Sequence, residues 1–151
     1  ITCKKATQLK DKDFVGKSDP YLVARVGEAP QQAATKVVHD NLNPEWNETL
    51  QLNVAKLDDF LMIECYDCDT MSDGGKADPK NRESDEILGI ACHSVEVDGQ
   101  VTWVPGIPLT GLEDGNEKDI ICRLADPTAK KQKDADGGML MLSLKYMDLD
   151  Q

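Results

Sequence analysis

Short segments in which apolar residues alternate with polar ones recur along this chain of 151 residues, and turn residues divide them. The clearest alternations fall at positions 50, 52 and 54 and at 140, 142 and 144. Such a period of two is typical of a strand with one buried face. Many short strands of this kind predict an all-β sandwich or barrel. The candidate strands cover residues 1–6, 21–26, 35–39, 49–54, 60–66, 87–95, 101–104, 120–124 and 139–146.

The chain carries a formal net charge of −11. This charge argues against nucleic acid as a partner, because nonspecific binding to phosphates requires a basic surface. It also argues against constitutive attraction to anionic lipid, unless part of the surface is neutralised. No apolar run approaches a membrane span, and no signal peptide is visible. Because the chain opens without Met, we expect residues 1–151 to form a single domain of a longer protein.

The five cysteines are odd in number and lie mostly within strand-like apolar patterns. This usage is typical of reduced thiols in an intracellular protein. Cys65-x-x-Cys68 has the spacing of a redox or zinc motif. However, it follows a strand rather than opening a helix, and only Cys92-His93 offers a second pair of metal ligands. We therefore interpret it as one buried thiol and one loop thiol.

Where one predicted strand ends, carboxylates replace apolar residues at alternate positions. Leu61, Ile63 and Cys65 share the parity of a buried face, and Asp67 and Asp69 continue that parity. Two such charges held 4 Å apart near a protein surface repel each other by roughly 4 kcal/mol. Their juxtaposition therefore requires either good solvation or a bound cation, and we favour the cation.

Acids also occur in the first loop, residues 11–20, and at the end of the third loop, residues 70–85, which begins at Asp67 and Asp69. Asp13 and Asp19 bracket a glycine turn before residues 21–26, and Asp85 and Glu86 precede residues 87–95. If these loops meet at one end of a sandwich, five or six carboxylates converge. Carboxylate oxygens on loops are ligands that Ca²⁺ prefers, whereas thiolates would suit softer metals.

Five motifs together resemble the C2 domain, the calcium- and phospholipid-binding β-sandwich. They are L-x3-D-x2-G-x-S-D-P-Y at 9–21, T-K-V-V-x3-L-N-P-x-W-N-E at 35–48, L-x-I-x3-D-x-D at 61–69, D-E-I-L-G at 85–89 and G-x-L-x-L-S-L-x-Y at 138–146. The resemblance covers nearly the whole chain in the family's order. It implies an eight-stranded antiparallel β-sandwich. Because the last motif closes the chain, it implies the permuted type II topology.

The resemblance also implies a site for two or three Ca²⁺ ions. Carried over by position, its ligands are Asp13, Asp19, Asp67 and Asp69, together with one acid at the end of the third loop. That acid is either Asp85 or Glu86, and the sequence leaves the choice open.

Membrane contacts follow from the same resemblance. Phe14 and Val15 at the tip of the first loop are candidates for insertion into the bilayer interface, and Met71 is a third. The alternative for Phe14 and Val15 is ordinary packing beneath the loop. Three bases of the long third loop are candidates for phosphate contacts or, alternatively, part of a solvated loop. These bases are Lys76, Lys80 and Arg82.

We therefore expect a non-enzymatic binding module that is cytoplasmic and monomeric and that docks on anionic phospholipid membranes when calcium binds. Trafficking proteins are further partners that the resemblance suggests, in exocytosis or signalling. The alternative is a calcium-independent C2 domain that binds other proteins and whose acids are structural. An enzyme is not expected, because no nucleophile motif accompanies the two histidines.

Overall fold

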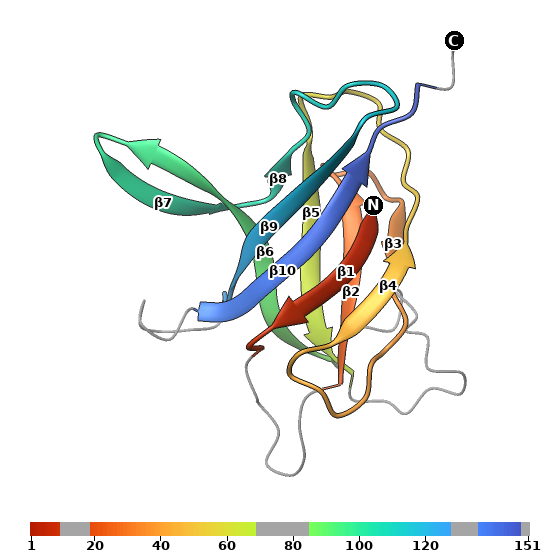
Figure 1. Cartoon of the computed structure of the whole chain (residues 1–151), viewed down its shortest axis with the longest axis vertical. Helices are drawn as coiled ribbons and strands as arrows, with labels where there is room; N and C mark the ends of the chain where they lie inside the picture. Colours follow the sequence, from red (N-terminus) through yellow and green to blue (C-terminus); the bar gives the residue numbers. More distant parts are fainter. Residues whose placement is uncertain (10–18, 69–84, 128–135, 149–151) are drawn as a thin grey trace.

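The computed structural model describes residues 1–9, 19–68, 85–127 and 136–148. These residues form ten β-strands and no helix, which confirms the all-β prediction (Figure 1). The family resemblance implied eight strands, and the larger number includes two very short ones, β3 and β8. The strands are β1 (Thr2–Thr7), β2 (Pro20–Val26), β3 (Gln32–Ala34), β4 (Glu45–Thr49), β5 (Phe60–Asp67), β6 (Glu86–Val97), β7 (Gln100–Pro105), β8 (Ile107–Pro108), β9 (Glu117–Ala125) and β10 (Asp136–Lys145).

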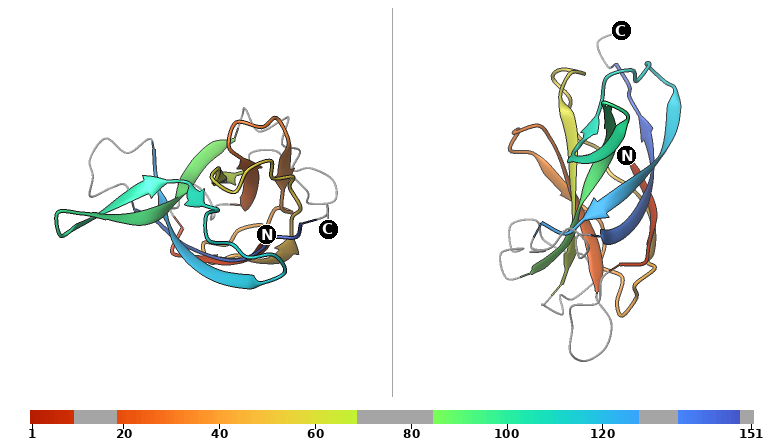
Figure 2. Two further views of the ribbon diagram at one scale, coloured as in Figure 1. Left: turned by 90° about the horizontal axis from the view of Figure 1, so that it is seen from above. Right: turned by 90° about the vertical axis from the view of Figure 1, so that its left-hand side faces the viewer.

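The strands form one antiparallel sheet that curls into two facing layers (Figure 2). Along the sheet the order is β3-β2-β5-β6-β9-β10-β1-β4, while β7 pairs with β6 and β8 pairs with β5. The curl lies between β6 and β9, where Ile90 pairs with Ala125 and Ala91 with Leu124. The strand that closes the chain, β10, lies between β9 and β1.

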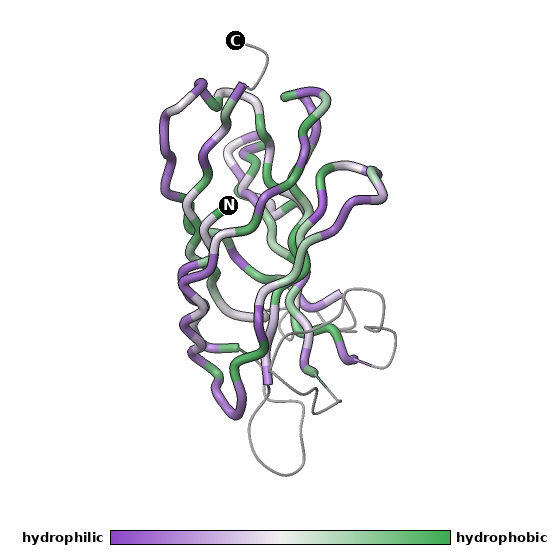
Figure 3. The backbone as a smooth tube through the Cα atoms, turned by 90° about the vertical axis from the view of Figure 1, so that its right-hand side faces the viewer, coloured by the Kyte–Doolittle hydropathy of each residue, from purple (hydrophilic) through white to green (hydrophobic). Residues whose placement is uncertain are grey.

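The core fills the space between the two layers. Leu61, Ile63 and Cys65 on β5 are at most 1% exposed, as their alternation predicts. Leu140 and Leu142 of β10 belong to the same buried cluster from the other layer. Along the backbone, apolar and polar residues alternate as a sheet with one buried face requires (Figure 3).

Residues 50–54 correct one strand prediction. The alternation there predicts a strand over 49–54, but β4 runs from Glu45 to Thr49 and residues 50–54 belong to no strand. The burial pattern still alternates: Leu50 is buried, Leu52 and Val54 are half-buried, and Gln51 is exposed. The pattern therefore identified the buried face correctly, whereas burial alone does not determine backbone pairing.

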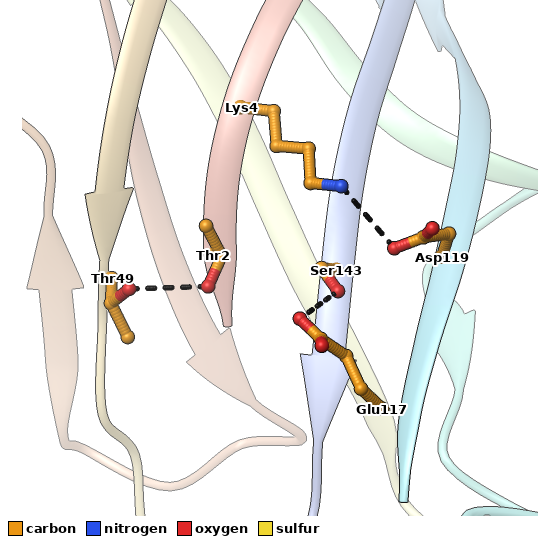
Figure 4. Close-up of polar contacts among 6 residues, drawn as sticks. All are labelled: Thr2, Lys4, Thr49, Glu117, Asp119 and Ser143. Carbon is orange, nitrogen blue, oxygen red and sulfur yellow. Dashed lines mark hydrogen bonds and ion pairs between the residues drawn. The ribbon is translucent and has the colours of Figure 1, made fainter.

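Polar contacts join strands on the outer face of the layer formed by β9, β10, β1 and β4 (Figure 4). Lys4 Nζ lies 3.3 Å from Asp119 Oδ1, which joins β1 to β9 across β10. The hydroxyl of Ser143 donates to Glu117 Oε1 at 2.6 Å. These contacts show that this face is the outer, solvated side of the layer.

The β6–β7 hairpin extends away from the body of the sandwich (Figures 1 and 2). Its turn contains Asp98 and Gly99, which both adopt positive φ, as a tight hairpin turn requires. Every residue of β7 is exposed. The guanidinium of Arg123 lies 5.8 Å from the centroid of the Trp103 ring, so this tryptophan packs across strands instead of entering the core.

Candidate functional site

Three strand ends that carry acidic residues meet at one end of the sandwich (Figure 1, lower end). β2 begins at Pro20, which pairs with Asp67 at the end of β5. Asp67 also pairs with Glu86 at the start of β6. The sheet register therefore brings together acids from three of the predicted motifs.

Asp67 is the most buried of these acids, with 1% of its surface exposed. Its Oδ1 accepts a hydrogen bond of 2.8 Å from the backbone N–H of Asp19. The strand parity that buries Ile63 and Cys65 points the Asp67 carboxylate toward the same side. Burying a carboxylate costs free energy that hydrogen bonds or a cation must offset.

Asp19 connects the start of β2 to two neighbouring segments. Its Oδ1 accepts a hydrogen bond of 2.6 Å from the backbone N–H of Asp40 and lies 3.7 Å from Nδ1 of His39. Its carbonyl accepts a hydrogen bond from the N–H of Cys68 at 3.0 Å. The side chain remains 26% exposed, so it is held in place at the edge of the site.

Asp85 and Glu86 have different surroundings. Glu86 lies directly opposite Asp67 in the ladder, so the two side chains share one face of the sheet. Asp85 instead accepts a 2.5 Å hydrogen bond from the hydroxyl of the fully buried Tyr21. The ring of Tyr21 stacks on Tyr66 on the outer face of β2 and β5, with centroids 5.7 Å apart. The geometry therefore places Glu86, rather than Asp85, beside Asp67.

The sequence did not reveal the bond between Tyr21 and Asp85. Tyr21 belongs to the S-D-P-Y motif and opens the predicted strand over residues 21–26. A hydroxyl that reaches a carboxylate 64 residues away depends on the pairing of β2, β5 and β6. Only the register of these strands makes the contact visible.

Only some of the predicted metal ligands lie among the described residues. Among residues 1–9, 19–68, 85–127 and 136–148, no three His, Cys, Asp or Glu side chains form a group that could hold a metal ion. Asp13 and Asp69 lie outside these residues. The donors that are described at this end of the sheet, Asp19, Asp67 and Glu86, all offer carboxylate oxygens. Such donors fit Ca²⁺ in kind, and they do not fit a metal that prefers sulfur.

The predicted membrane contacts fall outside the described residues. They are Phe14, Val15, Met71, Lys76, Lys80 and Arg82. The roles of these side chains therefore stay predictions.

None of the five cysteines forms a disulfide, and all five are buried. Cys65 and Cys68 therefore form no disulfide. Cys68 lies just after β5, outside any strand, as predicted, and its side chain is also buried. Burial raises the pKa of the Cys65 thiol, and the nearby Asp67 charge raises it further. A protonated, inaccessible thiol is unsuited to redox chemistry.

No helix within the described part of the chain has the length and apolar character needed to cross a bilayer.

The family model of the C2 domain matches residues 1–101. The chain therefore belongs to the C2 domain family. The fold agrees with this assignment: the first C2 domain (domain A) of plant Extended Synaptotagmin 1 superimposes with a TM-score of 0.70 at 23% identity, over 99% of this chain and 93% of that chain.

Two further similarities are informative. The calcium-bound structure of two C2 domains, A and B, of Extended-Synaptotagmin 2 gives a TM-score of 0.61 at 27% identity, over 96% of this chain and 43% of that one. A "Calcium-dependent lipid-binding protein" of Arabidopsis thaliana is 29% identical over 100% of this chain and 25% of its own length. The chain spans between 13% and 45% of the length of three curated relatives that it matches, one of which is this lipid-binding protein.

Proposed function

We propose that this domain binds anionic phospholipid membranes in response to calcium. The observation that supports the proposal best is the strand register, which pairs Glu86 with Asp67 and places Asp19 directly before Pro20, the other partner of Asp67. The chain carries a net charge of −11, so without a cation this acidic end repels anionic head groups. Membrane attachment should therefore depend on neutralisation of that end.

In this proposal the metal ligands are Asp13, Asp19, Asp67 and Asp69, with Glu86 as the last acid. Asp67 is the inner ligand, because its buried carboxylate gains most from a cation. Bound Ca²⁺ supplies positive charge and open coordination positions for the oxygens of lipid head groups. Asp85 is a positioning residue, because its bond to Tyr21 fixes the chain immediately before Glu86.

The remaining membrane contacts complete the proposal. Phe14 and Val15 enter the interface, where burial of each side chain contributes roughly 1.5–3 kcal/mol once repulsion is removed. Met71 adds apolar contact, and three bases, Lys76, Lys80 and Arg82, contact phosphates. Residues 1–151 act as one domain of type II topology, cytoplasmic and peripheral on the membrane, in a trafficking, secretion or signalling protein.

Two similarities support this proposal. One relative carries calcium-dependent lipid binding in its name, and Extended-Synaptotagmin 2, at 27% identity, has been solved with calcium bound.

A calcium-independent protein-binding domain is the second candidate. Asp19 and Asp85 are already hydrogen-bonded within the protein, to the Asp40 amide and the Tyr21 hydroxyl. Acids used in this way can be structural.

Liposome co-sedimentation separates the two candidates. The wild-type domain is mixed with phosphatidylserine vesicles in Ca²⁺ or in EGTA, beside the variant Asp67→Asn with Asp69→Asn. Asp119→Asn is the matched control, because it removes an acid from the exposed face of β9. We expect sedimentation of the wild type and of Asp119→Asn only in Ca²⁺, and loss of sedimentation in the double variant.

Calorimetry with Ca²⁺ completes the test. Binding heats that grow in the presence of lipid support the first candidate. Vesicle binding that ignores both EGTA and the double substitution, or the absence of binding heat in the folded wild type, would remove it.

A further inference from the structure

The free edge of β7 is available for pairing with another strand. The β6–β7 hairpin extends away from the sandwich, and no described strand pairs with the other side of β7 (Figures 1 and 2). Every residue of β7 is exposed, including Val101 at 62% and Trp103 at 37%. An exposed edge of this kind presents N–H and C=O groups that can form hydrogen bonds with a second strand.

The hairpin geometry determines which backbone groups face this edge. In an antiparallel pair, hydrogen-bonded and non-hydrogen-bonded residue pairs alternate. The N–H of Gly106 donates to the Ala91 carbonyl at 2.9 Å, and the two-residue turn requires the same alternation. The even-numbered residues of β7 therefore bond to β6, and the N–H and C=O groups of Val101 and Trp103 face away from it. Pro105 has the same orientation but no N–H to donate.

The other edges among the described strands are protected against such pairing, whereas β7 is not. β3 and β8 contain only three and two residues, too few for an extended ladder. β4 carries two acids, Glu45 and Glu48, and Asn47 between them has positive φ. Short length, charge and irregular backbone are the usual devices that protect an edge. β7 has six residues, and none of them is charged.

We propose that β7 pairs with β7 of a second copy of this domain, in antiparallel orientation about a two-fold axis at Thr102. In this register Val101 lies opposite Trp103 of the second copy, and every outward N–H group of both residues finds a carbonyl partner. A shift by two residues would place either Pro105, which has no N–H, or Gly99 of the turn opposite a strand residue. Either shift loses hydrogen bonds, so the backbone favours the symmetric register.

The side chains also match in this register. Val101 and Trp103 form a β-branched–aromatic pair on one face, and Thr102 meets Thr102 of the second copy on the other. Both are favourable cross-strand pairs. The guanidinium of Arg123 lies 5.8 Å from the centroid of the Trp103 ring, so this side chain loses less freedom when the strands pair. Pairing also removes apolar surface of Val101 from water.

The charge pattern fits a second copy. Two copies, each with a net charge of −11, repel each other wherever acids meet, but β7 carries no charge. Glu96 pairs with Val101 from β6, so three strand spacings, roughly 14 Å, separate it from Glu96 of the second copy. This distance exceeds the screening length of about 8 Å at physiological salt. Antiparallel pairing places the two turns, each with Asp98, at opposite ends of the ladder. The uncharged β7 edge therefore lets copies of this acidic domain meet.

The contact is small, because each copy contributes one strand. It falls below the roughly 1,200–2,000 Å² of a stable specific interface, so the dimer should be weak. We expect a dissociation constant of roughly 0.1–1 mM, at which the monomer expected from the sequence predominates in dilute solution. The pairing requires neither calcium nor lipid, because β7 lies outside the acidic end of the sheet. The inference therefore stands or falls independently of the proposed calcium-dependent docking.

The test uses substitutions of opposite charge at the exposed position 102, in EGTA and without vesicles. Thr102 faces its own copy only in the proposed register. Thr102→Lys and Thr102→Glu therefore each place like charges opposite each other, whereas an equimolar mixture of the two variants places opposite charges there. Thr110→Lys is the matched control, because Thr110 is also exposed and lies in a turn outside β7. Sedimentation equilibrium up to about 1 mM protein measures the mass, and amide NMR reports the fold and the site of pairing.

We expect the mass of the wild type and of Thr110→Lys to rise with concentration. The amide signals of Val101 and Trp103 should shift more than that of Thr102, whose N–H is already bonded to β6. Either substitution at position 102 should weaken dimerisation at least about tenfold, and the mixture should restore it.

Three results would overturn the proposal. The folded wild type could remain a monomer at the highest concentration, or both folded variants at position 102 could dimerise as tightly as the wild type. The third result is a mixture of the two variants that regains no association. Association that leaves the Val101 and Trp103 amide signals unshifted would equally contradict pairing through β7.

Discussion

Replacing Tyr21 by Phe removes one hydroxyl from the buried outer cluster next to the proposed calcium site. The hydroxyl donates to Asp85 Oδ2 at 2.5 Å, and the ring that carries it is fully buried against Tyr66. Phenylalanine preserves the ring stacking, so the loss is confined to the hydrogen bond. A hydrogen bond to a charged acceptor contributes roughly 1.5–3 kcal/mol. Asp85 is half-buried, so water partly replaces the lost donor, and we expect about 1.5 kcal/mol.

Urea unfolding measures this loss. For a domain of this size, with a slope of roughly 1–3 kcal/mol per molar urea, the midpoint should fall by roughly 1 M while the slope is unchanged. The melting temperature should fall by about 3–6 °C. Burial, followed by the bond to Asp85, raises the pKa of the Tyr21 hydroxyl, so this phenol should remain protonated throughout the experiment.

A double-mutant cycle tests the assignment of the energy to this contact. Asp85→Ala and the double variant complete the cycle, and we expect a coupling energy of about 1 kcal/mol or more. Tyr66→Phe is the matched control, because it removes a 2.8 Å bond to Glu64 two residues away on the same strand. A coupling energy within about 0.3 kcal/mol of zero between positions 21 and 85 would refute the reasoning.

Two further predictions concern stability. Gly138→Ala should lower the free energy of unfolding by at least about 2 kcal/mol more than Gly115→Ala does. Both glycines have positive φ (99° and 79°), but only at position 138 would the added Cβ clash with a backbone oxygen, that of Thr7. Equal unfolding midpoints of the two variants in urea would contradict this. Burial raises the pKa of Cys3 and Cys122 from 9.0 to about 12, so the folded state favours the neutral thiols. The contribution of these thiols to stability is complete below pH 9 and should be lost as the pH rises from 9 to about 12. Unfolding curves measured across that pH range would show the loss, and the loss should be smaller in Cys122→Ala. DTNB should react slowly with both thiols until the domain is unfolded.

Much of the fold could be predicted because strand patterns report burial directly. The alternation through Leu61 and Cys65 identified the buried face of β5, and it also pointed Asp67 to the buried side. The same rule failed at residues 50–54, where alternating burial occurs without a ladder partner. β4 was missed because its residues are mostly polar, and only Trp46 is buried.

The site could be predicted only as far as its motifs reach. Sequence spacing left Asp85 and Glu86 as equal alternatives, because adjacent residues differ only in which face of the sheet they occupy. The ladder between β5 and β6 places Glu86 opposite Asp67, and a bulge opposite Cys65 and Tyr66 shifts its register. Such a shift cannot be read from residue counts.

The pairing of β1 with β10 determines how the domain responds to mechanical tension. The two strands are antiparallel, with Thr2 opposite Ser143, so force applied through Ile1 and Lys145 acts at the same end of both. Such a load acts across the strands and breaks their hydrogen bonds one pair after another, whereas a load along them would strain all the bonds at once. A tether that pulls on both ends would therefore unzip β1 from β10 at low force, starting at the pair Thr2 and Ser143 and finishing at the pair Thr7 and Met139.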